Sequence, residues 1–254
     1  SFDAGTSNSD TTDTSTIKKS NKQSDAANFF GVAIDNAHTA YGDISTLKGI
    51  TAAMASQLKL HGQSVTLREN NVEAKTALSK IMDNGFDPNG SNTIYLDFET
   101  AANPDIKVDA ATAIPYEVAY VSGDGKVKGV LYFKDNLSAV KDFQADTTID
   151  GLRSMKEIEE LYTKNSVDVK STDDIKKQLQ DLLKGKTVVT YNGNNFDNVI
   201  LENIIADKVD TLDIYPVFKD VYTTKNIEAM GKKDTTKGDK APVKTTLDTI
   251  TNKV

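Results

Sequence analysis

The sequence predicts an α/β protein whose mixed β-sheet is covered by helices on both faces. Two apolar segments at 114–121 and 127–133 are joined by Ser122-Gly123-Asp124-Gly125, which is a strong signal for a β-hairpin. Apolar runs at 93–98 and 187–191 are typical of buried strands. Segments with the apolar spacing of helices alternate with the later strands, and this alternation favours a sheet with helices on both faces.

Changes in composition divide the chain into three parts. Residues 1–26 are mostly Ser, Thr, Asp, Asn and Lys, too polar to offset the entropy of ordering, so we expect a flexible tail. Residues 27–90 have apolar positions at three- and four-residue steps, which predicts two or three helices in a small N-terminal appendage. A turn-forming cluster at 87–92 marks the boundary of the main domain, residues 91–254.

The helices of the appendage are interpreted as packing surface without chemistry of their own. Asp43 and Ser45 are suited to cap the second helix, because short polar side chains accept hydrogen bonds from the free N–H groups of a first turn. The sequence assigns no further role to residues 1–90.

In the main domain, the strands of the hairpin are followed by three segments with helical periodicity, at about 136–145, 153–163 and 172–184. The buried strand at 187–191 then leads into a helix at 195–206. A short strand is expected at 210–214.

The composition limits the kinds of metal site that the chain can form. There is no cysteine, which excludes disulfides and thiolate ligands. The two histidines, His38 and His61, lie outside the main domain and are interpreted as exposed or capping residues, so a histidine-ligated zinc site is not expected. Any metal must be bound by oxygen ligands, which favours Mg²⁺ or Mn²⁺.

The net charge is −7, from 37 acidic and 30 basic residues. Proteins that coat duplex DNA are normally basic, whereas an enzyme that holds a few nucleotides through bound cations tolerates this charge. No apolar run approaches the roughly 20 residues of a membrane span, and no signal peptide is recognisable. We expect no membrane association and a cytoplasmic location, or a place in the virion if the protein is of phage origin.

The clearest indication of function is the pair Asp97 and Glu99 at the end of the strand 93–98. Side chains alternate across a strand, so both carboxylates lie on one face and Phe98 points to the other. Two carboxylates this close repel each other unless a cation lies between them. The alternative is a solvated charge pair at the end of an edge strand.

A second motif, Asn192-x-x-x-Phe196-Asp197, follows the second buried strand. Together with Asp97-x-Glu99 it resembles the first two motifs of the DEDD 3′–5′ exonucleases, whose fold is ribonuclease H-like. The resemblance is closest to the proofreading domains of family B DNA polymerases, and it extends over about residues 91–254.

The resemblance implies that Asp97, Glu99 and Asp197 are catalytic and bind two divalent cations, Mg²⁺ or Mn²⁺. In these roles Asp97 bridges both ions, Glu99 holds the ion that activates water, and Asp197 helps to fix the other. The resemblance places Asn192 and Phe196 near the 3′ end of a single-stranded DNA. Phe98, whose ring could stack on the terminal base, and Thr100 are further candidates for substrate binding. Phe196 has an alternative interpretation as a core residue.

The third motif of that family, a Tyr or His four residues before a fourth Asp, is missing. It should follow a helix that residues 244–250 resemble, and the sequence stops at Val254. Because it also starts at Ser1 rather than Met, we expect a processed piece of a longer polymerase or nuclease, with another polypeptide at its C-terminal edge. The alternative is a catalytically incomplete module with a structural or DNA-contacting role, for example in a phage particle.

Overall fold

A computed structural model describes residues 22–34, 39–67, 70–103, 109–144 and 153–230. Six strands form one sheet in the order β4-β3-β2-β1-β5-β6. The strands are β1 (Thr93–Thr100), β2 (Pro115–Ser122), β3 (Lys128–Phe133), β4 (Val169–Lys170), β5 (Thr187–Thr190) and β6 (Asp210–Asp213).

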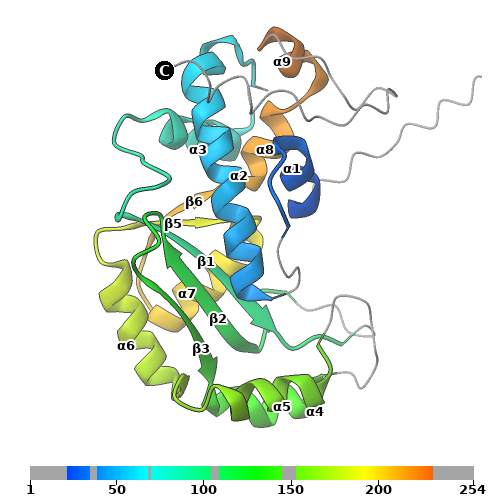
Figure 1. The fold of residues 1–254 in the computed structure, drawn as a ribbon, viewed down its shortest axis with the longest axis vertical. Coiled ribbons are helices and arrows are strands. Elements are labelled where there is room, and N and C mark those ends of the chain that lie inside the picture. The colour runs from blue at the N-terminus through cyan, green and yellow to red at the C-terminus, as the bar shows by residue number, and fades with distance from the viewer. Residues whose placement is uncertain (1–21, 35–38, 68–69, 104–108, 145–152, 231–254) are drawn as a thin grey trace, which may run out of the picture.

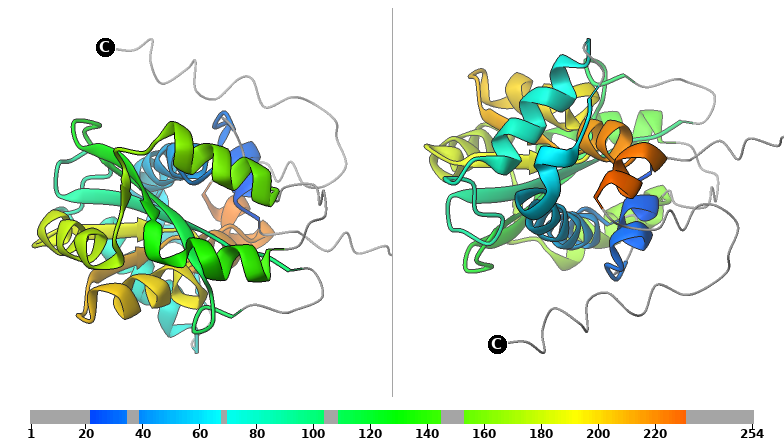
Figure 2. Two further views of the ribbon diagram at one scale, coloured as in Figure 1. Left: turned by 90° about the horizontal axis from the view of Figure 1, so that it is seen from below. Right: turned by 90° about the horizontal axis from the view of Figure 1, so that it is seen from above.

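Helices lie on both sides of this sheet, as the views in Figures 1 and 2 show. The α-helices are α1 (Gln23–Phe30), α2 (Ala40–His61), α3 (Val72–Met82), α4 (Leu137–Phe143), α5 (Met155–Lys164), α6 (Thr172–Leu183), α7 (Asp197–Ile205), α8 (Tyr215–Val221) and α9 (Thr224–Ala229). Short 3₁₀ turns are η1 (Gly62–Ser64), η2 (Lys134–Asn136) and η3 (Gly193–Asn195). No helix in the described part of the chain combines the length and apolarity needed to cross a bilayer.

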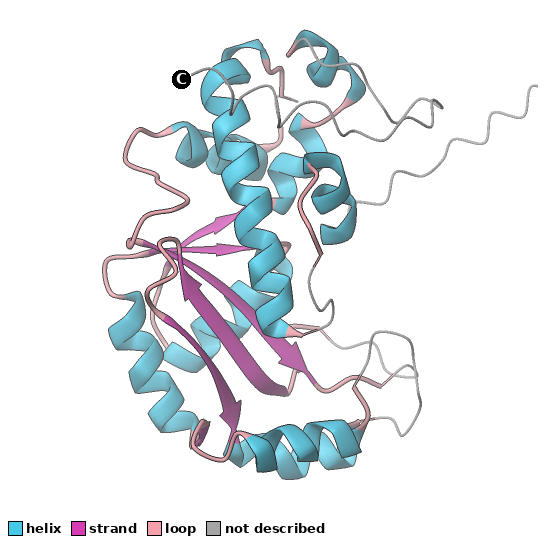
Figure 3. Cartoon of the chain, in the orientation of Figure 1, coloured by secondary structure: helices cyan, strands magenta, loops and turns pink. Residues whose placement is uncertain are grey.

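The sheet is mixed (Figure 3). Strand β2 is antiparallel to both β1 and β3, whereas β5 runs parallel to β1, β6 parallel to β5, and β4 parallel to β3. The predicted hairpin and the predicted α/β class are therefore confirmed, and the arrangement is compatible with a ribonuclease H-like fold.

The two faces of β1 have different surroundings. Ile94, Leu96 and Phe98 contact the core formed with α6 and α7, while Tyr95 on the opposite face contacts the core formed with α2. Since side chains alternate, Asp97 and Glu99 share the α2 face with Tyr95. A third apolar cluster lies beneath α4 and α5, at the start of β2 and the end of β3.

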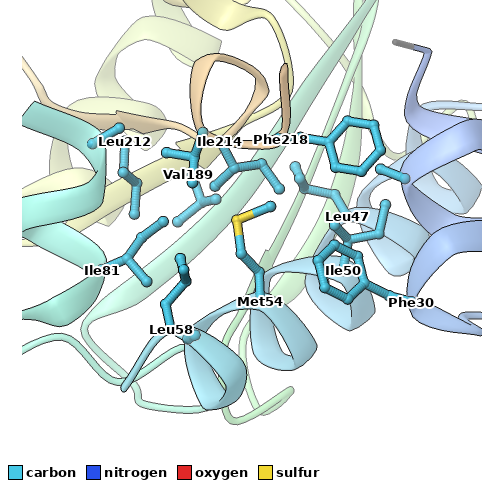
Figure 4. Packing of buried hydrophobic residues seen from close by; sticks show 14 of the residues in the cluster. Phe30, Leu47, Ile50, Met54, Leu58, Ile81, Val189, Leu212, Ile214 and Phe218 are labelled. Carbon is cyan, nitrogen blue, oxygen red and sulfur yellow. The ribbon is translucent and has the colours of Figure 1, made fainter. Parts of the chain in front are cut away.

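The N-terminal helices do not form a separate appendage. Buried residues of α2 such as Ile50, Met54 and Leu58 lie in one apolar cluster with Val189 and Leu212 of the sheet (Figure 4). The predicted boundary at 87–92 therefore separates two stretches of sequence that share one core. The sheet needs this shared core, because without α2 that face of the sheet would expose a continuous apolar surface.

The structure corrects two expectations about the N-terminal region. Helix α1 begins at Gln23, within the stretch 1–26 that was expected to be a flexible tail, because Ala26, Ala27 and Phe30 are buried and stabilise it. Helix α2 is capped by Thr39, whose Oγ1 accepts a hydrogen bond from the Gly42 N–H at 3.0 Å, and not by Asp43 or Ser45. Residues 1–21 lie outside the described residues.

Several short elements were not predicted: β4, α8 and α9. Strand β4 has only two residues, too few for a periodic pattern, and α8 and α9 have seven and six. The predicted helix at 244–250 and its proposed partner lie outside the described residues, as does His38. His61 is exposed at the end of α2, as predicted.

Candidate metal centre

Carboxylates from two distant segments meet above the C-terminal half of β1. Asp43, Asp97 and Glu99 each offer one oxygen, and these oxygens all lie within 4.8 Å of one another. The alternation of β1 places Asp97 and Glu99 on one face, as predicted, and α2 lies across that face. Asp43 is thereby a third acidic residue of the site, which the sequence did not reveal.

The position of Asp43 follows from the start of α2. Thr39 ends the incoming segment and caps the helix, which puts Asp43 in its first turn. The next residue, Ile44, is fully buried, and Leu47, one turn further on, is also buried, so this side of the helix is held against the sheet. Gln23 of α1 also donates from Nε2 to the Asp43 carbonyl at 2.6 Å. The cap, the buried side chains and this hydrogen bond together hold the first turn of α2 over the strand.

Asp197 lies beside this group, at the start of α7. Its Oδ1 accepts a hydrogen bond from the Phe98 N–H at 3.1 Å, and the residue is buried. It is thus tied to the residue between Asp97 and Glu99, and its charge acts strongly on Asp97. Asp197 does not, however, belong to the set of oxygens within 4.8 Å of one another. The structure thus brings Asp97 and Glu99 together with Asp43. Asp197 is tied to the same strand through the Phe98 N–H, and the predicted convergence of its carboxylate with those of Asp97 and Glu99 stays a prediction.

Burial and mutual repulsion disfavour the ionised forms of these acids. Burial first, and then the charges of Asp197, Glu99 and Asp43, raise the pKa of Asp97 well above its ordinary value. Burial raises the pKa of Glu99 to about 7, although the nearby Arg153 guanidinium opposes the shift. Burial likewise raises the pKa of Asp197 to about 7, against the hydrogen bond from Phe98. A bound cation would reverse these shifts.

The group formed by Asp43, Asp97 and Glu99 fits a hard divalent cation. Carboxylate oxygens are the ligands that Mg²⁺ and Mn²⁺ prefer. At ligand distances of about 2.0–2.1 Å, oxygens in an octahedral shell are separated by about 2.9 Å when adjacent and about 4.1 Å when opposite. Oxygens within 4.8 Å of one another reach these separations through small side-chain rotations.

The loop after β5 is held in shape by Asp213, a second residue whose role the sequence did not reveal. Asp213 Oδ1 accepts hydrogen bonds from the N–H groups of Asn192, at 2.8 Å, and Tyr215, at 2.9 Å, while Oδ2 accepts from Asn194 at 3.0 Å. Asn192 adopts a left-handed conformation, with φ 62°. Because Asp213 ends β6, this carboxylate connects the second motif to the neighbouring strand.

Gly193 is required in the same loop for steric reasons. A Cβ atom at this position would lie 2.0 Å from Thr190 Oγ1, closer than any real contact. The loop therefore folds tightly against the end of β5. Asn192 is partly exposed in this loop.

The structure separates the four residues that were expected to contact the substrate. Phe98 is 5% exposed, lies in the core on the face away from Asp97, and contacts the Phe133 ring with centroids 6.3 Å apart. The expectation that Phe98 contacts a nucleotide is therefore wrong, for the same reason of strand alternation that aligns the acids. Thr100 and Phe196 are partly exposed, and Phe196 also contacts the core.

Sequence signals for the missed acids are weak. Asp43 stands among helix-start residues, where acidic side chains are common because they favour the positive end of the helix dipole. Asp213 ends a strand in a pattern that many solvated loops share. Asp43 joins the site because α2 approaches β1. Asp213 holds the loop after β5 because β6 lies next to it.

No protein-family model, curated protein or solved structure matches this chain at a significant level, so its own residues and geometry carry the functional argument.

Proposed function

We propose that this chain is a metal-dependent 3′–5′ exonuclease that hydrolyses the terminal phosphodiester bond of DNA. The observation that carries the proposal is the convergence of Asp43, Asp97 and Glu99 within 4.8 Å, with the buried Asp197 tied to the same strand. Like charges gathered in a half-buried site are costly unless they serve to bind a cation.

Divalent ions at such a site supply neutralisation of the phosphate charge, alignment of the scissile bond and activation of a water molecule. Asp97 is the central ligand, because it lies within reach of Asp43 and Glu99 on one side and close to Asp197 on the other. In this proposal Glu99 and Asp43 hold one position and Asp197 the other. The chain thereby offers four carboxylates to the site without the missing third motif.

The choice of a DNA 3′ end rests on the resemblance of the two motifs. Asn192 and Phe196 flank the start of α7, and both are partly exposed near Asp197. An amide can donate to a sugar or phosphate oxygen, and an aromatic ring can stack on a base without regard to its identity. Their positions suit the binding of a terminal nucleotide.

The test compares wild-type protein, Asp97→Asn and the control Asp181→Asn, which lies exposed on α6 on the opposite side of the sheet. Release of nucleotides from 3′-labelled single-stranded DNA is measured with Mn²⁺ and with chelator. We expect metal-dependent release by wild type and Asp181→Asn, and loss of release in Asp97→Asn with the fold intact. Equal release by all three proteins would overturn the proposal. Mn²⁺ binding without release would instead favour a non-catalytic, DNA-contacting module.

A further inference from the structure

Arg153 lies beside the acidic group and is held in place through its backbone. Its carbonyl oxygen accepts a hydrogen bond from Gln144 Nε2 at 2.9 Å, and Gln144 Oε1 accepts one from the Ala102 N–H at 2.8 Å. Ala102 follows the strand that carries Asp97 and Glu99. One glutamine therefore fixes the backbone of Arg153 to the end of β1.

Among the described residues, groups bind the Arg153 guanidinium at one of its nitrogens. Nη1 donates to Glu117 Oε2 at 2.5 Å and to Tyr116 Oη at 3.4 Å, and the group lies over the Tyr116 ring at 5.9 Å. The Glu117 side chain is 3% exposed and that of Arg153 15%. Nε and Nη2 donate to no group among the described residues. The arginine is thus fixed in direction, and most of its donors have no partner in the part of the chain that the structure describes.

The Arg153 guanidinium lies close to one of the proposed metal ligands, Glu99. Glu117 of β2 is directly opposite Glu99 of β1, so their side chains emerge on the same face of the sheet as neighbours. The charge of Arg153 is also the strongest favourable influence on Glu99. The guanidinium is therefore placed at the edge of the site, on the side of Glu99.

Neutralising Glu117 does not by itself explain an arginine here. A buried ion pair stabilises a fold little compared with an apolar pair of similar volume. A guanidinium has a second use that apolar groups lack, since its planar edge binds two oxygens of a phosphate. An arginine fixed by a buried acid, with its other edge free beside clustered carboxylates, has the form of a phosphate-binding residue.

We propose that Arg153 binds a non-bridging phosphate oxygen of the nucleotide at this site, aimed by Glu117 and Tyr116. This inference rests on the proposed function and adds a phosphate contact supplied by the protein to those made through cations. It also assigns Glu117 as a positioning residue, which acts on the phosphate through Arg153.

The test measures binding of thymidine 5′-monophosphate in the presence of Mg²⁺, separately from Mn²⁺ binding and from cleavage. The proteins are wild type, Arg153→Gln, Glu117→Gln, the double variant Arg153→Gln/Glu117→Gln, and Lys156→Gln. Lys156 is a matched control because it is a nearby cation whose side chain is 85% exposed.

We expect Arg153→Gln to weaken nucleotide binding by at least about tenfold, the loss of one charge-assisted contact, while Mn²⁺ binding persists. Lys156→Gln should change it by less than about twofold. Arg153→Gln alone leaves Glu117 buried without its partner and lowers stability, and the double variant restores stability. If Arg153 binds phosphate, the double variant stays as weak as Arg153→Gln in nucleotide binding.

Recovery of nucleotide binding together with stability in the double variant would overturn the inference, because Arg153 would then serve only to neutralise Glu117. Wild-type protein that binds no thymidine 5′-monophosphate would overturn it as well. If wild-type protein binds the nucleotide but releases none from DNA, the proposed activity is contradicted. Comparing nucleotide binding by wild type and the Arg153 variants would still test whether Arg153 binds phosphate.

Discussion

Asp43 of helix α2 and Asp97 of strand β1 bring carboxylate oxygens within 4.8 Å of each other, although they belong to segments that the sequence assigns to different domains. The pair joins the N-terminal helices to the sheet at the point where the acidic motif ends. It also adds a third acid to the pair that β1 carries.

Replacing Asp43 by Asn should have opposite effects on stability and on metal affinity. Without metal, the variant should be more resistant to urea than wild type, because one charge is removed from a group of like charges. With Mn²⁺, its affinity should fall by at least about tenfold, since a direct ligand is lost. Urea unfolding with and without metal, and a Mn²⁺ titration, measure both.

The matched control for this variant is Asp181→Asn, which removes the same charge from the exposed side of α6. Its Mn²⁺ affinity should equal that of wild type. If Asp43→Asn bound Mn²⁺ with wild-type affinity, Asp43 of α2 would not be a ligand of the metal.

The stabilising effect of Glu99→Gln in metal-free protein should grow with pH. The pKa of Glu99 is about 7 in the fold and about 4.3 when unfolded, so between these values the folded state binds more protons. Its contribution to the free energy of unfolding is therefore present below pH ~4 and lost as the pH rises through 7. We expect little difference between variant and wild type at pH 4 and a clear advantage for the variant at pH 8.

This comparison uses the difference between two proteins, so acids elsewhere with lowered pKa values, such as Asp210, cancel. Saturating Mn²⁺ should abolish the advantage at pH 8. An advantage that is constant from pH 4 to pH 8 would contradict the assigned shift.

Asp213→Asn should destabilise the protein by about 1–3 kcal/mol, because the new amide group faces backbone N–H donors that now lack an acceptor. The loop that carries Asn192 should lose its fixed shape, and nucleotide release should slow. Denaturant unfolding measures the loss of stability, and the release assay measures the rate of nucleotide release. Asp210→Asn, on the same strand but with a side chain 55% exposed, is the control and should cost less than half as much.

The two phenylalanines near the motifs should respond differently to replacement by Leu. Phe98→Leu should lower the free energy of unfolding by about 1–2 kcal/mol without changing affinity for single-stranded DNA, since the ring is buried away from the acids. Phe196→Leu should weaken DNA binding by about fivefold or more through loss of stacking. Equilibrium binding with Ca²⁺ in place of Mn²⁺ separates binding from cleavage. Weaker DNA binding by Phe98→Leu at full stability would restore the interpretation rejected above.

Strand periodicity predicted much of the sheet and half of the site. The hairpin of β2 and β3 was evident from its glycine turn, and alternation along β1 placed Asp97 and Glu99 together. Periodicity describes one element at a time, however, and Asp43 depends on how α2 crosses the sheet. The same limit explains Asp213 and Arg153, because the groups that bind their side chains lie on other elements.

The core that α2 shares with the sheet also decides how the protein can be divided. Residues 91–254 on their own would lack α2, which covers the apolar face of β1 and β2, and would also lack Asp43. They could therefore not be transferred to another protein with this core and this group of acids intact. The smallest transferable unit has to start ahead of α1, because Gln23 holds the first turn of α2. Helices α1 and α2, which the sequence presents as an appendage, therefore have to be moved together with the sheet.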